Sequence, residues 1–195
     1  RNASSPSGDT ISRSRPPRCG SSGRTSRSYS AAAGAASSLP GVLVPVIDGR
    51  QRSVFAMTEP GGAGSDPGQL ATEAVFDGSD YVINGRKWLI TGADGARTWI
   101  IMARVAPNPH GPDGPTLFLC DGLTPGIELE RVMNTMDRNY VQGHGVVEFR
   151  DLTLPATAVL GEVGQALRYA QLRLTPARLT HCMRWLGAAA RAHSI

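Results

Sequence analysis

The sequence predicts a mainly β fold, in which a small barrel or sandwich is followed by one helix of an incomplete helical bundle. Three observations lead to this prediction. Short apolar segments in the middle of the chain are separated by turns, which use many of its 23 glycines and 14 prolines. Beyond residue 160 the apolar residues recur every three to four positions instead. The first 41 residues hold almost no large apolar side chains.

The chain therefore divides into three parts. Residues 1–41 form a low-complexity arm, residues 42–160 a β-domain, and residues 161–195 the start of a truncated C-terminal helical domain. Ser, Arg, Gly, Pro and Ala dominate the arm. Because such a segment cannot bury enough apolar surface to offset its ordering entropy, we expect it to be disordered. A transit peptide is an alternative, since the arm is rich in Arg and Ser and poor in acids.

The formal net charge of +4 lies in this arm. Residues 1–40 hold six arginines and one acid, Asp9, whereas the remainder of the chain is close to neutral. A basic arm can bind nucleic acid, but Tyr29 is the only aromatic side chain in it on which a base could stack. We therefore expect no nucleic-acid partner.

Short strand-like segments follow one another through the β-domain. They cover residues 69–76, 81–83, 86–91, 98–105, 116–120, 127–132 and 145–149. Asn84-Gly85 is the pair most favoured in a two-residue hairpin turn, so we expect a hairpin between the second and third segments. Six or seven short strands with such punctuation are typical of a small all-β barrel or sandwich.

The C-terminal part carries the apolar stripe of an amphipathic helix. The stripe consists of Leu172, Thr175, Leu179, Cys182, Leu186 and Ala189. Arg173, Arg184 and Arg191 fall on a different face. Pro176 interrupts the pattern, so we expect a bend or a fresh helix start there. The stripe has no partner in this chain, which indicates a helical domain that is mostly absent.

Two classes of site are not expected. No apolar run approaches the ~20 residues that span a bilayer, so we predict no membrane span. Cys19, Cys120 and Cys182 are widely separated, with no C-x-x-C pair and no His at ligand spacing. The sequence therefore predicts neither a disulfide framework nor a metal site, and a reducing compartment.

Three stretches resemble one family, in the same order and spacing. "MTEPGGAGSD", residues 57–66, resembles the T-E-P-G-A-G-S-D signature of acyl-CoA dehydrogenases. "YVINGRKWLITG", residues 81–92, resembles the family's Y-x-I-N-G-x-K-W-x-I-T segment. Residues 123–165 resemble the stretch that closes its middle β-domain and opens its C-terminal helices. The resemblance covers about residues 43–195, and it implies that the low-complexity arm stands in place of an N-terminal helical domain.

The resemblance implies an FAD-dependent enzyme of fatty acid β-oxidation. Its reaction would be α,β-dehydrogenation of an acyl-CoA thioester, with hydride transfer to flavin N5. The implied partners are the acyl-CoA substrate, an electron-transferring flavoprotein as acceptor, and further copies in a homo-oligomer. Bacterial cytoplasm and mitochondrion are both compatible. An acyl-CoA oxidase of the same fold is one alternative. Another is a non-catalytic truncated remnant, or a β-domain that only binds a partner.

By the same resemblance, two segments contact FAD, and glycines of the first let the backbone approach the ring and its phosphates. The matching residues are Phe55, Met57, Thr58, Ser65, Leu89, Ile90 and Thr91. Thr58 would donate to the pyrimidine edge, and Thr91 would bond the N5 and O4 side. Ser65 would also serve the bound thioester. Leu89 stands where the family commonly has Trp.

The resemblance also places Arg178 beside the acyl-CoA site. Some members carry a catalytic Glu immediately before this arginine, but here that position is Ala177. Glu59 belongs to the signature loop and is expected to be a structural acceptor. We therefore predict that this chain holds no catalytic base and is inactive as it stands.

Overall fold

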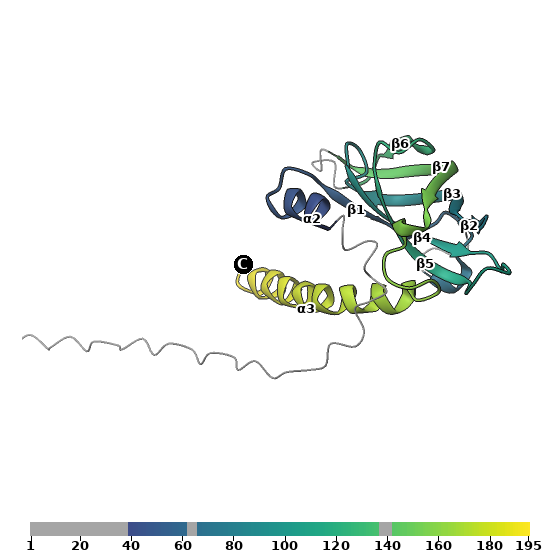
Figure 1. Ribbon diagram of the computed structural model, residues 1–195. Helices are drawn as coiled ribbons and strands as arrows, with labels where there is room; N and C mark the ends of the chain where they lie inside the picture. The colour runs from purple at the N-terminus through teal and green to yellow at the C-terminus, as the bar shows by residue number, and fades with distance from the viewer. Residues whose placement is uncertain (1–38, 62–65, 137–141) are drawn as a thin grey trace, which may run out of the picture.

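A computed structural model of the protein describes residues 39–61, 66–136 and 142–195. Seven strands form one curled sheet, and a long helix runs beneath it (Figure 1). The prediction of a mainly β fold with a C-terminal helix is confirmed. The predicted disordered arm lies outside the described residues, except for its last three.

The elements follow one another with short connections. The strands are β1 (Ser53–Ala56), β2 (Glu73–Phe76), β3 (Asp80–Thr91), β4 (Thr98–Val105), β5 (Gly114–Asp121), β6 (Ile127–Met133) and β7 (His144–Pro155). The helices are α2 (Leu39–Ile47), α3 (Ala166–His193) and the short 3-10 helices η1 (Pro67–Gln69) and η2 (Ala156–Ala158). The bounds of β4 agree with the sequence-based prediction, whereas α2 was not predicted.

Strand β4 is the element around which the sheet curls. β5 pairs with one edge of β4 along its whole length. β1 and β2 both run parallel to β4 and share its other edge, β1 along residues 98–101 and β2 at residues 104–105. β3, β7 and β6 then follow β2 by antiparallel pairing. As a result β1, which leads directly into the first motif, also contacts β3, which carries the second.

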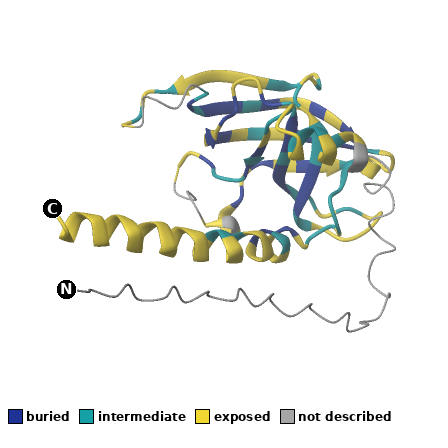
Figure 2. Cartoon of the chain, turned by 90° about the vertical axis from the view of Figure 1, so that its left-hand side faces the viewer, coloured by how far each residue is buried: buried dark blue, intermediate teal, exposed yellow. Residues whose placement is uncertain are grey.

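Two hydrophobic clusters form the core, and most of their buried residues lie in the strands and in the first turns of α3 (Figure 2). The larger cluster joins the strands, and its largest fully buried side chains include Ile83, Ile101, Phe118, Phe149 and Leu152. The smaller cluster joins the sheet to α3 and consists of Leu70, Met102, Leu117, Ala166 and Ala170. The beginning of α3 is thus anchored on the sheet.

The predicted hairpin at Asn84-Gly85 is wrong, because β3 runs without a turn through both residues. The chain turns earlier, where the Asp77 carboxylate accepts the backbone N–H groups of Ser79 and Asp80, both at 2.8 Å. Gly85 instead lies at an irregularity in the pairing of β3 with β7. A Cβ there would lie 2.7 Å from the Cα of Thr72, so the position requires glycine for close approach.

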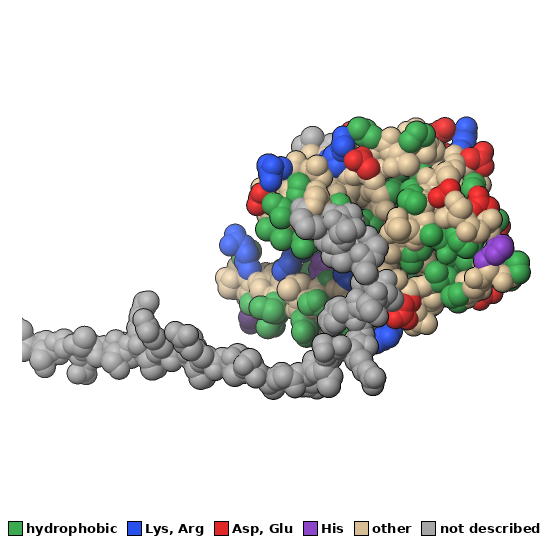
Figure 3. All heavy atoms as spheres, in the orientation of Figure 1, with side chains coloured by type: hydrophobic (Ala, Val, Ile, Leu, Met, Phe, Trp, Pro, Cys, Tyr) green, Lys and Arg blue, Asp and Glu red, His purple; other side chains and the backbone are tan. Residues whose placement is uncertain are grey.

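Helix α3 differs from its prediction in one way. It is one continuous helix through Pro176, so of the bend or fresh start expected there, the fresh start is wrong. The predicted apolar stripe is exposed, with Leu172 64% and Leu186 73% exposed, which agrees with the prediction that it has no partner in this chain. The sheet packs instead against Ala166 and Ala170, whose small side chains allow the helix to approach closely. Hydrophobic side chains are accordingly visible on the surface of α3 (Figure 3). None of the helices in the described part of the chain is long and apolar enough to cross a membrane.

Gly85→Ala should lower the free energy of unfolding by about 1–3 kcal/mol, because its Cβ would collide with the backbone of Thr72 at a φ of +152°. Gly111→Ala is the matched control, since nothing lies within 4 Å of its added Cβ. Urea unfolding of both variants measures the effect. Equal stability of the two variants would contradict the close approach.

Candidate functional site

The signature loop and the end of β3 meet through Thr58 and Trp88. The Thr58 hydroxyl donates to the Trp88 carbonyl at 2.6 Å, and the Trp88 N–H donates to the Thr58 carbonyl at 3.1 Å. Residues that are 30 positions apart in the sequence are therefore held side by side. Because the Thr58 hydroxyl proton is already donated to Trp88, Thr58 can donate to a ligand only through its backbone N–H.

Strand β3 is irregular immediately beyond this contact. The pairing of β3 with β7 shifts between Lys87 and Ile90, and Leu89 has a φ of +55°. Positive φ is rare for a side chain of this size, and such strain clusters at functional sites. Its effect is that Leu89 is 43% exposed while Ile90 is 2% exposed, in the larger core cluster. Ile90 can therefore contact a ligand only through its backbone atoms.

Thr91 lies beyond Ile90 and shares the outward face of Leu89, since alternate residues of a strand point to the same side. Its hydroxyl is 2.9 Å from Nδ1 of His144 on β7. Which of these two atoms donates depends on the histidine tautomer. The Thr91 hydroxyl can therefore donate to a ligand while accepting from the His144 ring.

Phe55 of β1 and Met57, the residue after β1, are half-buried and alternate with the core residues Val54 and Ala56. Both pack on the smaller cluster, towards α3. Phe55 lines a pocket of about 280 Å³ between the sheet and α3.

The Arg173 guanidinium also lines this pocket, 5.4 Å from the centroid of the Phe55 ring, which is a cation–π contact. The sequence analysis placed Arg173 only on a face away from the apolar stripe. Its spacing of seven from Ala166 and three from Ala170 could have identified its place towards the sheet.

Glu59 and Lys87, which adjoin Thr58 and Trp88 in the sequence, form a buried ion pair. The Lys87 ammonium is fully buried and donates to Oε1 of Glu59 at 2.7 Å and to the Met57 carbonyl at 3.1 Å. The Glu59 carboxylate also accepts the backbone N–H groups of Ala71, at 2.6 Å, and Thr72, at 2.9 Å. The expected role of Glu59 as a structural acceptor agrees with these contacts.

The two members of the pair titrate differently from free side chains. Burial lowers the pKa of Lys87 to about 8, although the bond to Glu59 and its charge act in the opposite direction. Burial alone would raise the pKa of Glu59, but the hydrogen bonds from Lys87 and the Ala71 amide outweigh it, so this pKa lies below its ordinary value.

Lys87 was not predicted to be a site residue, although it is a fixed position of the second motif and the strand pattern also pointed to it. Lys87 continues the alternation of the inward-facing residues Tyr81 and Ile83 along the strand, so the pattern places the only lysine of the chain inside.

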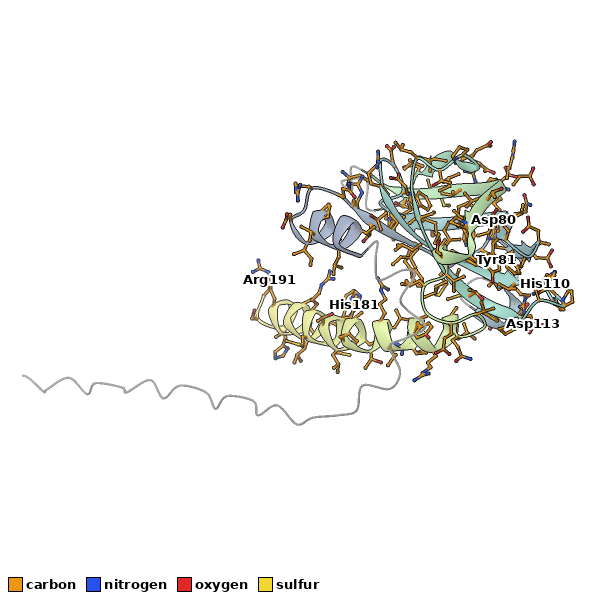
Figure 4. All side chains as sticks on the ribbon, in the orientation of Figure 1. Asp80, Tyr81, His110, Asp113, His181 and Arg191 are labelled. Atoms are coloured by element: carbon orange, nitrogen blue, oxygen red, sulfur yellow. The ribbon has the colours of Figure 1, made fainter. Side chains whose placement is uncertain are left out.

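The structure does not place two of the predicted site residues, Ser65 and Arg178, beside the other predicted site residues. Ser65 lies outside the described residues. Arg178 lies on the exposed part of α3 and donates to Oε1 of Gln171 at 2.9 Å. His181 and Arg191 lie on the same part of the helix, which extends beyond the sheet (Figure 4). No cluster of acids, histidines or cysteines that could hold a metal occurs among residues 39–61, 66–136 and 142–195.

Comparison with known proteins defines the class. Residues 54–152 match the family described as "Acyl-CoA dehydrogenase, middle domain". The chain belongs to the acyl-CoA dehydrogenase family, as its motifs indicated.

Among its relatives is the "Probable acyl-CoA dehydrogenase FadE2" of Mycobacterium tuberculosis, 43% identical over 155 residues that cover 77% of this chain. The chain spans only 37% of the length of that relative.

Solved structures of the family have the same fold. A member from Mycobacterium abscessus is 39% identical, with a TM-score of 0.71 over 79% of this chain and 39% of its own. An acyl-CoA dehydrogenase of Bacillus anthracis, solved in complex with FAD, is 25% identical, with a TM-score of 0.57 over 66% of this chain and 22% of its own. The family to which this chain belongs therefore binds FAD.

Lys87→Met should lower the free energy of unfolding by about 3–5 kcal/mol, because it leaves the buried Glu59 carboxylate without its counter-ion. The double variant Lys87→Met/Glu59→Gln should lose less than Lys87→Met alone, since no buried charge is then unpaired. Urea unfolding of both variants measures this difference. A double variant less stable than Lys87→Met would show that Glu59 does not depend on Lys87.

Proposed function

We propose that this chain supplies the flavin-binding domain of an FAD-dependent acyl-CoA dehydrogenase that introduces an α,β double bond into an acyl-CoA thioester. The observation that carries the proposal is the junction of the signature loop with the end of β3. Thr58 is bonded there to Trp88, directly before the strained and exposed Leu89. Membership of the family supports the same conclusion.

The residues at this junction fit the ring system of FAD. The positive φ of Leu89 turns its side chain out of the core, where it can cover a flat ring by dispersion. The Thr58 N–H and the Thr91 hydroxyl are donors suited to the polar edges of such a ring. Phe55 and Met57 would support it from β1. The part proposed for Ser65 rests on the motif alone.

FAD, when bound, supplies the hydride acceptor of the proposed reaction. The part of the protein is to place donors where negative charge develops on the ring, which lowers the barrier without reorganisation at the moment of reaction. Thr58 and Thr91 are the proposed donors. Glu59 cannot readily act as a base, because Lys87 and two backbone amides already occupy its carboxylate. We therefore do not propose Glu59 as the base, and the absence of a catalytic base from this chain stays a prediction.

The partners of the whole enzyme are proposed from the family resemblance. An acyl-CoA thioester would lie beside Arg178, and an electron-transferring flavoprotein would accept the electrons. We also propose a homo-oligomer, in the bacterial cytoplasm or the mitochondrion. An oxidase of the same fold would instead consume oxygen when given an acyl-CoA, which an oxygen electrode detects.

Titration of FAD with the purified chain tests the central proposal. Bound flavin should show quenched fluorescence and a resolved visible spectrum that stays with the protein on gel filtration. Flavin that remains free at protein concentrations of up to about 100 μM, where binding weaker than roughly 5 kcal/mol would escape detection, would overturn the proposed function.

Thr91→Val should weaken FAD binding about 3- to 10-fold, which corresponds to one net hydrogen bond of 0.5–1.5 kcal/mol. The matched control is Thr153→Val, because Thr153 is also an exposed strand threonine and its hydroxyl bonds only locally, to the Asp151 carbonyl. Fluorescence titration of both variants measures the dissociation constants. An equal effect of the two substitutions would remove Thr91 from the proposed site.

Arg178→Ala should weaken binding of an acyl-CoA about tenfold, the size of one hydrogen bond to a charged group. Arg184→Ala is the control, since Arg184 is an exposed arginine of the same helix that the proposal does not use. Calorimetric titration with an acyl-CoA compares the two variants. Unchanged affinity in Arg178→Ala would return this residue to the class of surface charges.

A further inference from the structure

We infer that Lys87 is a positioning residue for flavin, because its ammonium group fixes the backbone on both sides of Thr58 against the strained end of β3. This inference rests on the proposed function and deepens it. It assigns a role to a side chain that belongs to the second motif but that the reaction chemistry does not single out. Lys87 does not touch the ring in this assignment, but acts through the residues that do.

The contacts of Lys87 bracket Thr58. The ammonium holds the carbonyl of Met57, the residue before Thr58, and the carboxylate of Glu59, the residue after it. The next residue of the strand, Trp88, bonds Thr58 itself through both its N–H and its carbonyl. Residues 57–59 and 87–88 therefore form a closed set of contacts, which holds the Thr58 backbone against Trp88, the residue before Leu89.

A second set of contacts holds the segment that follows the signature loop, residues 68–72. Glu59 accepts the amides of Ala71 and Thr72, which lie just before β2. Arg104 of β4 donates to the carbonyls of Leu70, at 3.2 Å, and Gly68, at 3.0 Å. Glu59 thus links the start of the loop to the segment after it, and Lys87 is the cation paired with Glu59.

A buried ion pair is a poor device for stability alone. An apolar pair of similar volume is often at least as stabilising, because both ions must be removed from water. An ammonium ion, however, can hold a carbonyl and a carboxylate together in one geometry, which no apolar side chain can do. The placement of this buried pair beside Thr58 points to the fixing of geometry as its use.

The first test separates positioning from stability. Lys87→Met is compared with Leu152→Ala, a core substitution expected to cost about 2–5 kcal/mol. Leu152 pairs with Ile83, roughly 25 Å along β7 from the Thr91 end of the sheet. At matched folded fractions, Lys87→Met should bind FAD at least tenfold more weakly than the parent chain, and Leu152→Ala within twofold of it. Equal affinity in the two variants would overturn the positioning role.

The second test uses the titration of Lys87, whose pKa lies at about 8. Glu59 is the charged group that faces it from the loop, and the nearby cation Arg104 is bonded to carbonyls of the segment that follows the loop. FAD affinity of the parent chain should fall as the pH rises through about 8, when the ammonium loses its proton. Lys87→Gln keeps a donor but does not titrate, so it should lack this pH dependence. A parent and a Lys87→Gln chain with the same pH profile would contradict the inference.

A readout without flavin distinguishes this inference from the proposed function. In the NMR spectrum of the chain alone, the amide signals of Thr58 and Trp88 should shift with a midpoint near pH 8, and Lys87→Gln should abolish the shift. If the shift is present but FAD does not bind, the proposed function fails. If FAD binds but the shift is absent, the positioning role of Lys87 fails.

Discussion

The rest of the site depends on the buried ion pair between Lys87 and Glu59. Two buried charges are expensive, and they are tolerated here because four hydrogen bonds satisfy them. Those bonds tie together three parts of the chain that are distant in sequence: the end of β1, the segment before β2, and the middle of β3. The pair therefore makes the signature loop part of the sheet rather than an appendage to it.

Strand β3 serves both the fold and the site, and its two irregularities explain how. Gly85 lets the strand pass within contact distance of Thr72, so that the segment held by Glu59 can lie against it. The positive φ of Leu89 then reverses the order of inward and outward side chains, so that Leu89 and Thr91 face outwards around a buried Ile90. A regular strand would offer neither the close approach nor this outward pair.

Helix α3 is anchored on the sheet by small residues and not by its large apolar side chains. Its first turns contact the sheet through Ala166, Ala170 and the aromatic ring of Tyr169, and Arg173 extends the same face over Phe55. Small residues allow a short distance between helix and sheet, so the larger side chains remain on the other faces. The exposed apolar stripe is consistent with our expectation that α3 opens a helical domain, which stays a prediction.

The sequence by itself determined the family, the mainly β class, the bounds of β4 and the existence of α3, because periodicity and motifs are local properties of a chain. The tertiary structure alone decided whether Asn84-Gly85 turns or continues, which face of α3 packs, and that Lys87 is buried against Glu59. These outcomes depend on residues far away in the sequence. Local turn propensity was overruled at Gly85 because pairing with β7 and contact with Thr72 stabilise a continuous strand.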